Sequence, residues 1–284
     1  MYKVLALVGL LVMALIAAAL LYAGSQWDEG TVRLRARLEG TRVPIRPTVY
    51  DPSELDSLPA PVQRYLRLVL RPGQRMIAAV HLRHTGTFNM SDTSQRWVPF
   101  ASSQRVITRR PGFDWDARIR VIPGIAVRVH DAYVGGEGLL HAALLAMFPI
   151  VIQRGTPELA EGELMRFLAE APWYPTALLP SQGVRWEPVD ERTAVATLTD
   201  RRVTASLVYR FAPNGLIESV RSERRPRLVG AVVLPTPWLG RWSDWQWLNG
   251  VRIPTHGEVA WLLPRGPLPY WRGGVTGITY EVAR

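Results

Sequence analysis

The sequence predicts a mainly β (α+β) protein, with a curved antiparallel sheet or half-open β-barrel, covering helices and one preceding transmembrane helix. Three observations support this fold class. An uncharged apolar run lies near the N-terminus, apolar and polar residues then alternate over long stretches, and turn signals recur between these stretches. We expect a transmembrane anchor over residues 1–23, a spacer over 24–56 and a β-rich extracytoplasmic domain over 57–284.

The N-terminal run, residues 4–22, has 19 apolar or small residues and no charge. As a helix it would span about 28 Å, close to the roughly 30 Å hydrocarbon core of a bilayer. A cleaved signal peptide is the alternative, because Ala17, Ala18 and Ala19 resemble a small-residue cleavage site. The run is longer than the usual signal core of about 7–15 residues, which favours an uncleaved anchor.

Charged residues flank the run on both sides, with Lys3 before it and three arginines within residues 33–37 after it. Asp28 and Glu29 lie closest to its distal end. We expect a single-pass protein of the cytoplasmic membrane whose large domain is extracytoplasmic. The three arginines fit a solvated surface, with added attraction to anionic lipid headgroups of about 1 kcal/mol each as the alternative.

The charge balance of the 284-residue chain is basic, with 34 basic and 24 acidic side chains. Lys3 is the only lysine, and this uniform preference for arginine indicates codon bias in a GC-rich genome. The arginines are dispersed among carboxylates and no nucleic-acid-binding motif is present, so we predict no nucleic-acid partner. A denser group is interpreted as solvated surface: Arg221, Arg224, Arg225 and Arg227. The absence of cysteine excludes disulfides, thiolate metal sites and acylation of a cysteine.

Helical spacing marks two covering helices. Residues 57–70 have Ser57 as a candidate N-cap and an apolar face made of Val62, Tyr65, Leu66 and Val69. Residues 156–171 open with a threonine N-cap followed by proline and glutamate, which is a strong helix start. Its predicted buried stripe consists of Leu159, Leu164, Phe167 and Leu168.

Strands are predicted by alternation with a period of two. In residues 76–90, one face carries Val80, Leu82, His84 and Phe88. Residues 113–121 alternate most regularly, with Trp115 on the apolar face and two aspartates and two arginines on a face that we expect to be solvated. Residues 139–152 fit either a helix or strands. Turns at 213–215 and 249–250 then separate the strands of a meander, for a total of about ten to twelve strands.

Tryptophan is concentrated near the C-terminus, where six of the 11 fall within residues 238–271. Large aromatic rings line apolar ligand cavities, and they equally fill ordinary cores. Alternation places Trp238 and Trp242 on one strand face and Trp245 and Trp247 on the other. The predicted cavity lining consists of Phe88, Trp115, Trp242, Trp245, Trp247, Trp261 and Trp271.

Five stretches carry a family resemblance: 58–66, 111–116, 131–136, 173–180 and 249–254. Through them the chain resembles an uncharacterised bacterial family, a domain of unknown function with an N-terminal hydrophobic segment. Residues 203–262 are more distantly similar to the lipoprotein-carrier fold of LolA- and LolB-type proteins. That resemblance implies a half-open barrel closed by helices, with an apolar cavity for acyl chains. The chain differs from the acylated members of that group because it has no cysteine.

We therefore expect a membrane-anchored domain of the bacterial envelope that binds a lipid or other apolar ligand, with the helix at 156–171 as a lid. A protein-interaction or envelope-scaffold module is the alternative, and it would present an exposed apolar patch instead of a cavity. An enzyme is less expected, because no catalytic, metal-binding or cofactor-binding signature is present. Its candidate residues would be Asp114, Asp116, His84 and Glu187. Nothing in the sequence indicates an oligomeric state.

Overall fold

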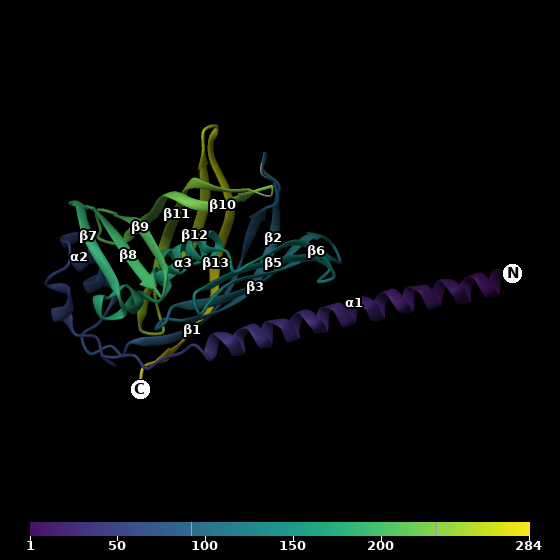
Figure 1. Cartoon of the computed structure of the whole chain (residues 1–284), viewed down its shortest axis with the longest axis horizontal. Helices are drawn as coiled ribbons and strands as arrows, with labels where there is room; N and C mark the ends of the chain where they lie inside the picture. Colours follow the sequence, from purple (N-terminus) through teal and green to yellow (C-terminus); the bar gives the residue numbers. More distant parts are fainter. Residues whose placement is uncertain (92, 231) are drawn as a thin grey trace.

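The computed structural model describes residues 1–91, 93–230 and 232–284. Helix α1 (Tyr2–Glu39) is continuous and has two different halves (Figure 1). Its N-terminal half projects away from the rest of the chain, is fully exposed, and is long and apolar enough to cross a membrane. Its C-terminal half buries one face, which consists of Ala23, Trp27, Thr31, Leu34 and Leu38.

The first part of the predicted spacer is therefore helical. Residues 24–39 continue α1, and the spacing of three or four residues between its buried positions is that of a single helix face. Leu34 and Leu38 form a small separate core with Ala79, Ile107 and Ala132 of the sheet. The prolines within the predicted spacer begin only at Pro44, after the helix has ended.

Two further α-helices cover the sheet, α2 (Ala60–Val69) and α3 (Pro157–Glu170). The predicted apolar face of α2 is fully buried, but the helix begins after Pro59, so Ser57 is not its cap. The predicted cap of α3 is confirmed, because the Thr156 hydroxyl accepts a hydrogen bond from the amide of Leu159. Four short 3₁₀ helices complete the helical content of the described residues: η1 (Pro52–Leu55), η2 (Ala171–Trp173), η3 (Pro175–Leu178) and η4 (Pro180–Gln182).

One antiparallel sheet contains all the strands of the described residues. Its first meander comprises β1 (Ile77–Asn89), β2 (Trp97–Ile107), β3 (Gly112–Ile122), β4 (Ile125–Val134), β5 (Glu137–Leu144) and β6 (Phe148–Arg154). The second comprises β7 (Val184–Asp190), β8 (Thr193–Asp200), β9 (Val203–Phe211), β10 (Ile217–Val229), β11 (Val232–Leu248), β12 (Val251–Leu263) and β13 (Gly266–Val282). The ambiguous segment 139–152 thus lies mostly in strands β5 and β6.

The two meanders are joined in the middle of the sheet, where β1 pairs with β13. The order is β6-β5-β4-β3-β2-β1-β13-β12-β11-β10-β9-β8-β7, which leaves β6 and β7 at opposite edges. The segment between these two edge strands contains α3, and α3 contacts β3, β4 and β5 from one half and β9 and β10 from the other. The sheet therefore curves around α3 as an open half-barrel (Figure 1).

Candidate ligand-binding cavity

A cavity of about 420 Å³ lies between α3 and the concave face of the sheet. Six tryptophans contribute to its wall: Trp115, Trp173, Trp238, Trp242, Trp261 and Trp271. Helix α3 supplies the opposite wall through Leu159, Glu163, Arg166, Ala169 and Glu170. The space is thus mainly aromatic, with a charged group along one side.

Five of the seven predicted lining residues lie in this wall: Phe88, Trp115, Trp242, Trp261 and Trp271. The other two do not. Trp245 packs edge-on against Tyr65 of α2, with ring centroids 5.9 Å apart, and Trp247 is 44% exposed beneath the guanidinium of Arg71. Asp244, whose φ of 56° is left-handed, interrupts the regular strand between Trp242 and these two residues.

Sequence reasoning missed Trp173, because it follows α3 in a proline-rich segment without periodicity. Its ring lies 4.9 Å from that of Trp242 in a T-shaped pair, and its indole N–H donates to the carbonyl of Pro254 at 3.0 Å. Trp238, whose face was predicted correctly, donates to the hydroxyl of Tyr270 at 2.9 Å. These hydrogen bonds fix the two rings in place.

Two glycines make room for tryptophan rings, Gly257 for a ring on the neighbouring strand and Gly273 for a ring on its own strand. A Cβ atom at position 257 would lie 2.7 Å from a ring carbon of Trp242, which pairs with Gly257 across the sheet. A Cβ atom at position 273 would collide with the ring of Trp271. Any larger residue at either position would displace a cavity wall.

The charged side of the cavity is organised by Arg166. Its guanidinium donates to Asp131 at 2.6 Å and to Glu170 at 2.8 Å, and Gln104 donates to the other Glu170 oxygen at 2.6 Å. The same guanidinium lies 5.0 Å from the ring centroid of Trp115. Arg166 is therefore fully engaged by carboxylates and aromatic faces.

Glu163 stands beside this cluster and is 6% exposed. Burial raises the pKa of Glu163 well above its usual range, and the neighbouring negative charge of Asp131 raises it further. A protonated Glu163 can donate to Asp131, which accounts for the two buried carboxyl oxygens, Glu163 Oε2 and Asp131 Oδ1, that otherwise lack a donor.

The four residues named as candidates for an enzyme site do not lie together in the structure. His84 is 1% exposed in the inner core beside Trp173, and burial, followed by the charge of Arg166, lowers its pKa to about 3. Glu187 is exposed on the edge strand β7. Asp114 and Asp116 lie on the other face of the sheet, under α1. Among the described residues no group of histidine and carboxylate side chains could hold a metal ion.

The expectation of a solvated face on β3 is wrong for its two aspartates, because the C-terminal half of α1 covers them. Asp114 is fully buried and accepts from Arg35 Nε at 2.8 Å. Asp116 accepts from the indole N–H of Trp27 and the hydroxyl of Thr31, both at 3.2 Å. Arg35, which was assigned to solvent or lipid headgroups, is therefore part of this interface.

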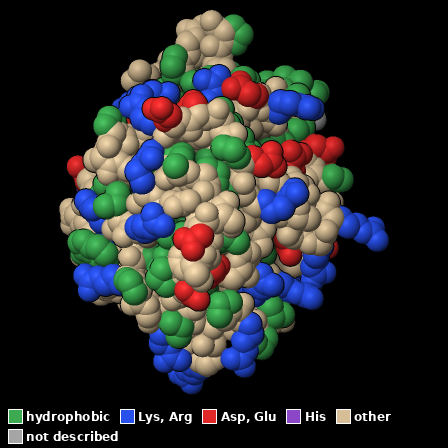
Figure 2. Space-filling model, turned by 90° about the vertical axis from the view of Figure 1, so that its left-hand side faces the viewer, with side chains coloured by type: hydrophobic (Ala, Val, Ile, Leu, Met, Phe, Trp, Pro, Cys, Tyr) green, Lys and Arg blue, Asp and Glu red, His purple; other side chains and the backbone are tan. Residues whose placement is uncertain are grey.

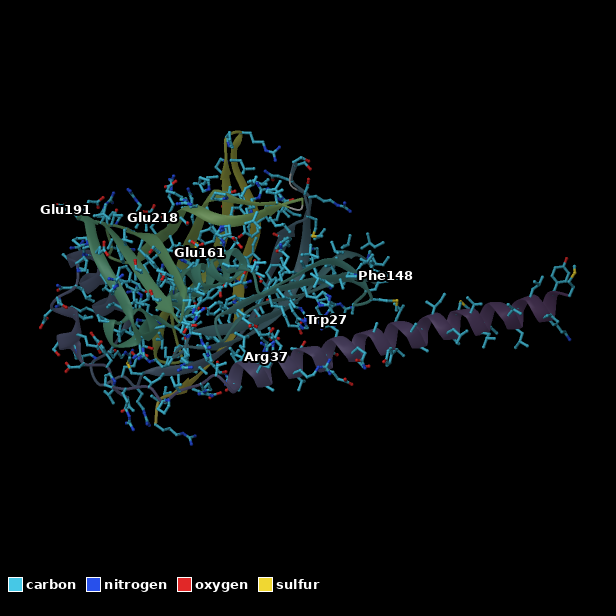
Figure 3. The ribbon with its side chains drawn as sticks, in the orientation of Figure 1. Trp27, Arg37, Phe148, Glu161, Glu191 and Glu218 are labelled. Atoms are coloured by element: carbon cyan, nitrogen blue, oxygen red, sulfur yellow. The ribbon has the colours of Figure 1, made fainter. Side chains whose placement is uncertain are left out.

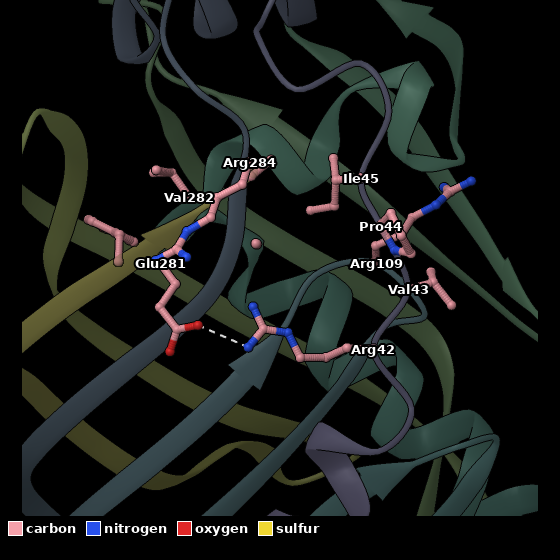
Figure 4. Close-up of a pocket in the computed structure, with 11 residues that line it drawn as sticks. Arg42, Val43, Pro44, Ile45, Arg109, Glu281, Val282 and Arg284 are labelled. Carbon is pink, nitrogen blue, oxygen red and sulfur yellow. Dashed lines mark hydrogen bonds and ion pairs between the residues drawn. The ribbon is translucent and has the colours of Figure 1, made fainter.

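A second pocket, of about 850 Å³, lies between segment 42–45 and the end of β13 (Figure 4). Among its charged residues Arg42 pairs with Glu281 at 2.9 Å, and Arg109 and Arg284 line the pocket as well. Because Tyr280 is the one aromatic residue in its lining, the inner cavity is the better candidate site for an apolar ligand.

Basic and acidic side chains are interspersed on the face turned away from the N-terminus of α1 (Figure 2). Such a mixed surface does not generate the extended positive field with which proteins attract nucleic acid.

Several solved structures are similar to the chain at low identity. One is described as an outer membrane lipoprotein-sorting protein domain from Vibrio parahaemolyticus, at 10% identity and a TM-score of 0.37, covering 72% of this chain and 85% of that one. A DUF1329 family protein from Desulfovibrio piger has 13% identity and a TM-score of 0.36, with 72% and 87% covered. A LolA superfamily protein from Nitrosomonas europaea has 14% identity and a TM-score of 0.32, with 80% and 96% covered.

The last of these structures bears the name of the LolA group to which residues 203–262 were compared. No curated protein matches the chain. All five stretches that carried the family resemblance fall within residues 56–280. These residues match the model of a family of unknown function, DUF6920, and the chain belongs to that family.

Proposed function

We propose that the protein binds a lipid or another apolar molecule in the inner cavity, at the outer face of the cytoplasmic membrane. The observation that carries this proposal is the aromatic cavity of about 420 Å³, a volume typical of small-molecule sites. Each methylene group that moves from water into such a cavity contributes roughly 0.8 kcal/mol. An acyl chain therefore gains useful affinity without any catalytic group.

The position of the cavity relative to α1 supports access from a bilayer. The β5–β6 hairpin exposes Met147, Phe148, Ile150 and Ile152, of which the last three are more than half exposed. Figure 3 shows Phe148 at the end of the domain that faces the N-terminal half of α1. With α1 retained in the membrane, these apolar side chains lie at the bilayer surface. The same two strands supply Leu140 and Gln153 to the cavity wall.

Helix α3 has the position of a lid. It contributes a whole wall of the cavity and contacts both halves of the open sheet. Its N-terminal turn, around Leu159, follows directly on β6 and the exposed hairpin. We propose that ligand passes between α3 and the strands at this end.

The scaffold alternative would assign the exposed β5–β6 hairpin to a protein partner, with the cavity left empty. Native mass spectrometry distinguishes ligand binding in the cavity from the scaffold alternative. The full chain, purified in detergent, is compared with Val259→Trp, which places a large ring at a half-buried position of the wall. Val189→Trp, at a position 58% exposed on β7, is the matched control.

We expect co-purified lipid on the wild-type chain and on Val189→Trp, and at least a several-fold loss on Val259→Trp. If the wild-type chain carries no lipid and takes up none when it is added, the binding proposal fails. Equal lipid on all three chains would show that the lipid is bound outside the cavity.

A further inference from the structure

Arg225 is a buried cation in the cavity wall that the proposed function does not use. It is 7% exposed, although it belongs to the arginine group of residues 221–227 that was interpreted as solvated surface. Its guanidinium lies 4.8 Å from the ring centroid of Trp238. Its neighbour Arg224 is exposed.

An irregularity in β10 turns Arg225 inward. Ser222 pairs with Trp238, but the next pair is Arg225 with Thr236, so the register shifts between them. Ser222 and Arg225 are both buried, whereas regular alternation from Ser222 would have pointed Arg224 inward. Bulges of this kind re-aim single side chains and are frequent next to binding sites.

No carboxylate lies within ion-pair distance of Arg225 among the residues that the structure describes. The acidic side chains nearby are already committed. Asp131 and Glu170 are held by Arg166, and burial raises the pKa of Glu163 well above its usual range although the positive charges of Arg225 and Arg166 oppose that rise. The stacked ring of Trp238 compensates only part of a buried positive charge.

Buried charges in proteins are normally paired, because leaving one unpaired is costly. We infer that Arg225 binds the acidic headgroup of the ligand, and that the cavity therefore takes an anionic amphiphile, with a carboxylate or phosphate on Arg225 and an apolar chain along the tryptophans. The planar guanidinium suits both kinds of oxyanion. This inference rests on the proposed ligand-binding function and adds the chemical class of the ligand.

A competition experiment tests the inference on the full chain in phosphatidylcholine nanodiscs at pH 7.5. The reporter is a diazirine-bearing hexadecanol, and labelled cavity peptides are quantified by mass spectrometry. The competitors share a 16-carbon chain: palmitic acid, hexadecyl phosphate, hexadecanol and hexadecylamine. We expect one or both acids to compete better than hexadecanol by on the order of 10-fold to 100-fold, the usual effect of a hydrogen bond to a charged group.

The preferred acid distinguishes a fatty acid from a phosphate-bearing lipid. Arg225→Gln should abolish the preference for the acids over hexadecanol, Arg225→Lys should keep part of that preference, and the exposed neighbour Arg224→Gln should keep all of it. Equal competition by acid and alcohol in the wild-type chain, or a preference for the amine, would overturn the inference even if the variants failed to fold. Absence of saturable labelling of the cavity would instead refute the proposed function.

Discussion

The two faces of strands β2–β4 are both covered by a helix, but in different ways. On the outer face, α1 closes against the sheet, and the carboxylates of Asp114 and Asp116 each receive donors from the helix. On the inner face, α3 packs against β5 and β9 but leaves a cavity of about 420 Å³ beside β3 and β4. A buried cation without an ionic partner among the described residues, Arg225, lines that cavity.

The difference separates a structural interface from a binding surface. A contact that only holds elements together gains by filling space and matching charges, because voids and unpaired polar groups cost free energy. Trp27 illustrates this: it is 5% exposed, stacks on His130 at 4.3 Å and donates to Asp116. The inner face instead has a cavity and a buried charge without an ionic partner among the described residues. Both are expected where a bound ligand fills the space and pairs with the charge.

The largest effect is expected from breaking the outer interface. Trp27→Ala removes a buried ring and the donor to Asp116, and should lower the free energy with which α1 docks on the sheet by about 3 kcal/mol. Hydrogen exchange of residues 24–39 in the full chain should then accelerate. Val32→Ala, on the same helix but 68% exposed, is the control and should change stability by less than about 0.5 kcal/mol. Similar effects of the two substitutions would contradict the observed docking face.

A smaller effect concerns acid pH and one histidine on each face. Burial lowers the pKa of His84 on the inner face to about 3, and that of His130 on the outer face to about 4. In the unfolded chain both groups titrate near 6.5. Below pH 6.5 the unfolded state therefore binds more protons than the folded state, and the free energy of unfolding falls as the pH falls, by up to about 1.4 kcal/mol per pH unit for each histidine.

Denaturant unfolding of the full chain between pH 6.5 and 5 measures this slope. His84→Leu and His130→Leu should each have a shallower slope than the wild-type chain, because each removes one group that the unfolded state protonates. Asp114 works in the opposite direction, since burial raises its pKa to about 6, but it is present in all three chains. Three identical slopes would show that these histidines are not held neutral in the folded state.

Most of the fold follows from local patterns. The alternation at 113–121, the cap at Thr156 and the Asn249–Gly250 turn each depend on neighbours in sequence, and the structure confirms each of them. Burial of Asp114 could not be predicted in this way, because it depends on α1, which is distant in the sequence and packs on that face of the sheet. Residues 24–39 were predicted as part of a spacer together with the proline-containing segment that follows them, and they are helical.

The site was predictable only in part. The density of tryptophan marked Trp242 and Trp245 alike, but only Trp242 lines the cavity, because Asp244 between them adopts a left-handed conformation that no sequence period reveals. Arg225 was missed for a similar reason, since a register shift in β10 decides which of two adjacent arginines points inward. Trp173 lies in a non-periodic segment, where the position of a side chain depends on tertiary contacts.

The most direct test of the contrast between the two faces is hydrogen exchange of the full chain in phosphatidylcholine nanodiscs, with and without saturating palmitic acid. Ligand in the inner cavity should slow exchange in α3 and in β10–β12, by filling the space between them. Residues 24–39 of α1, which close an interface that is already filled, should exchange at an unchanged rate. Protection confined to α1, or spread equally over both faces, would contradict the assignment of the inner face as the binding surface.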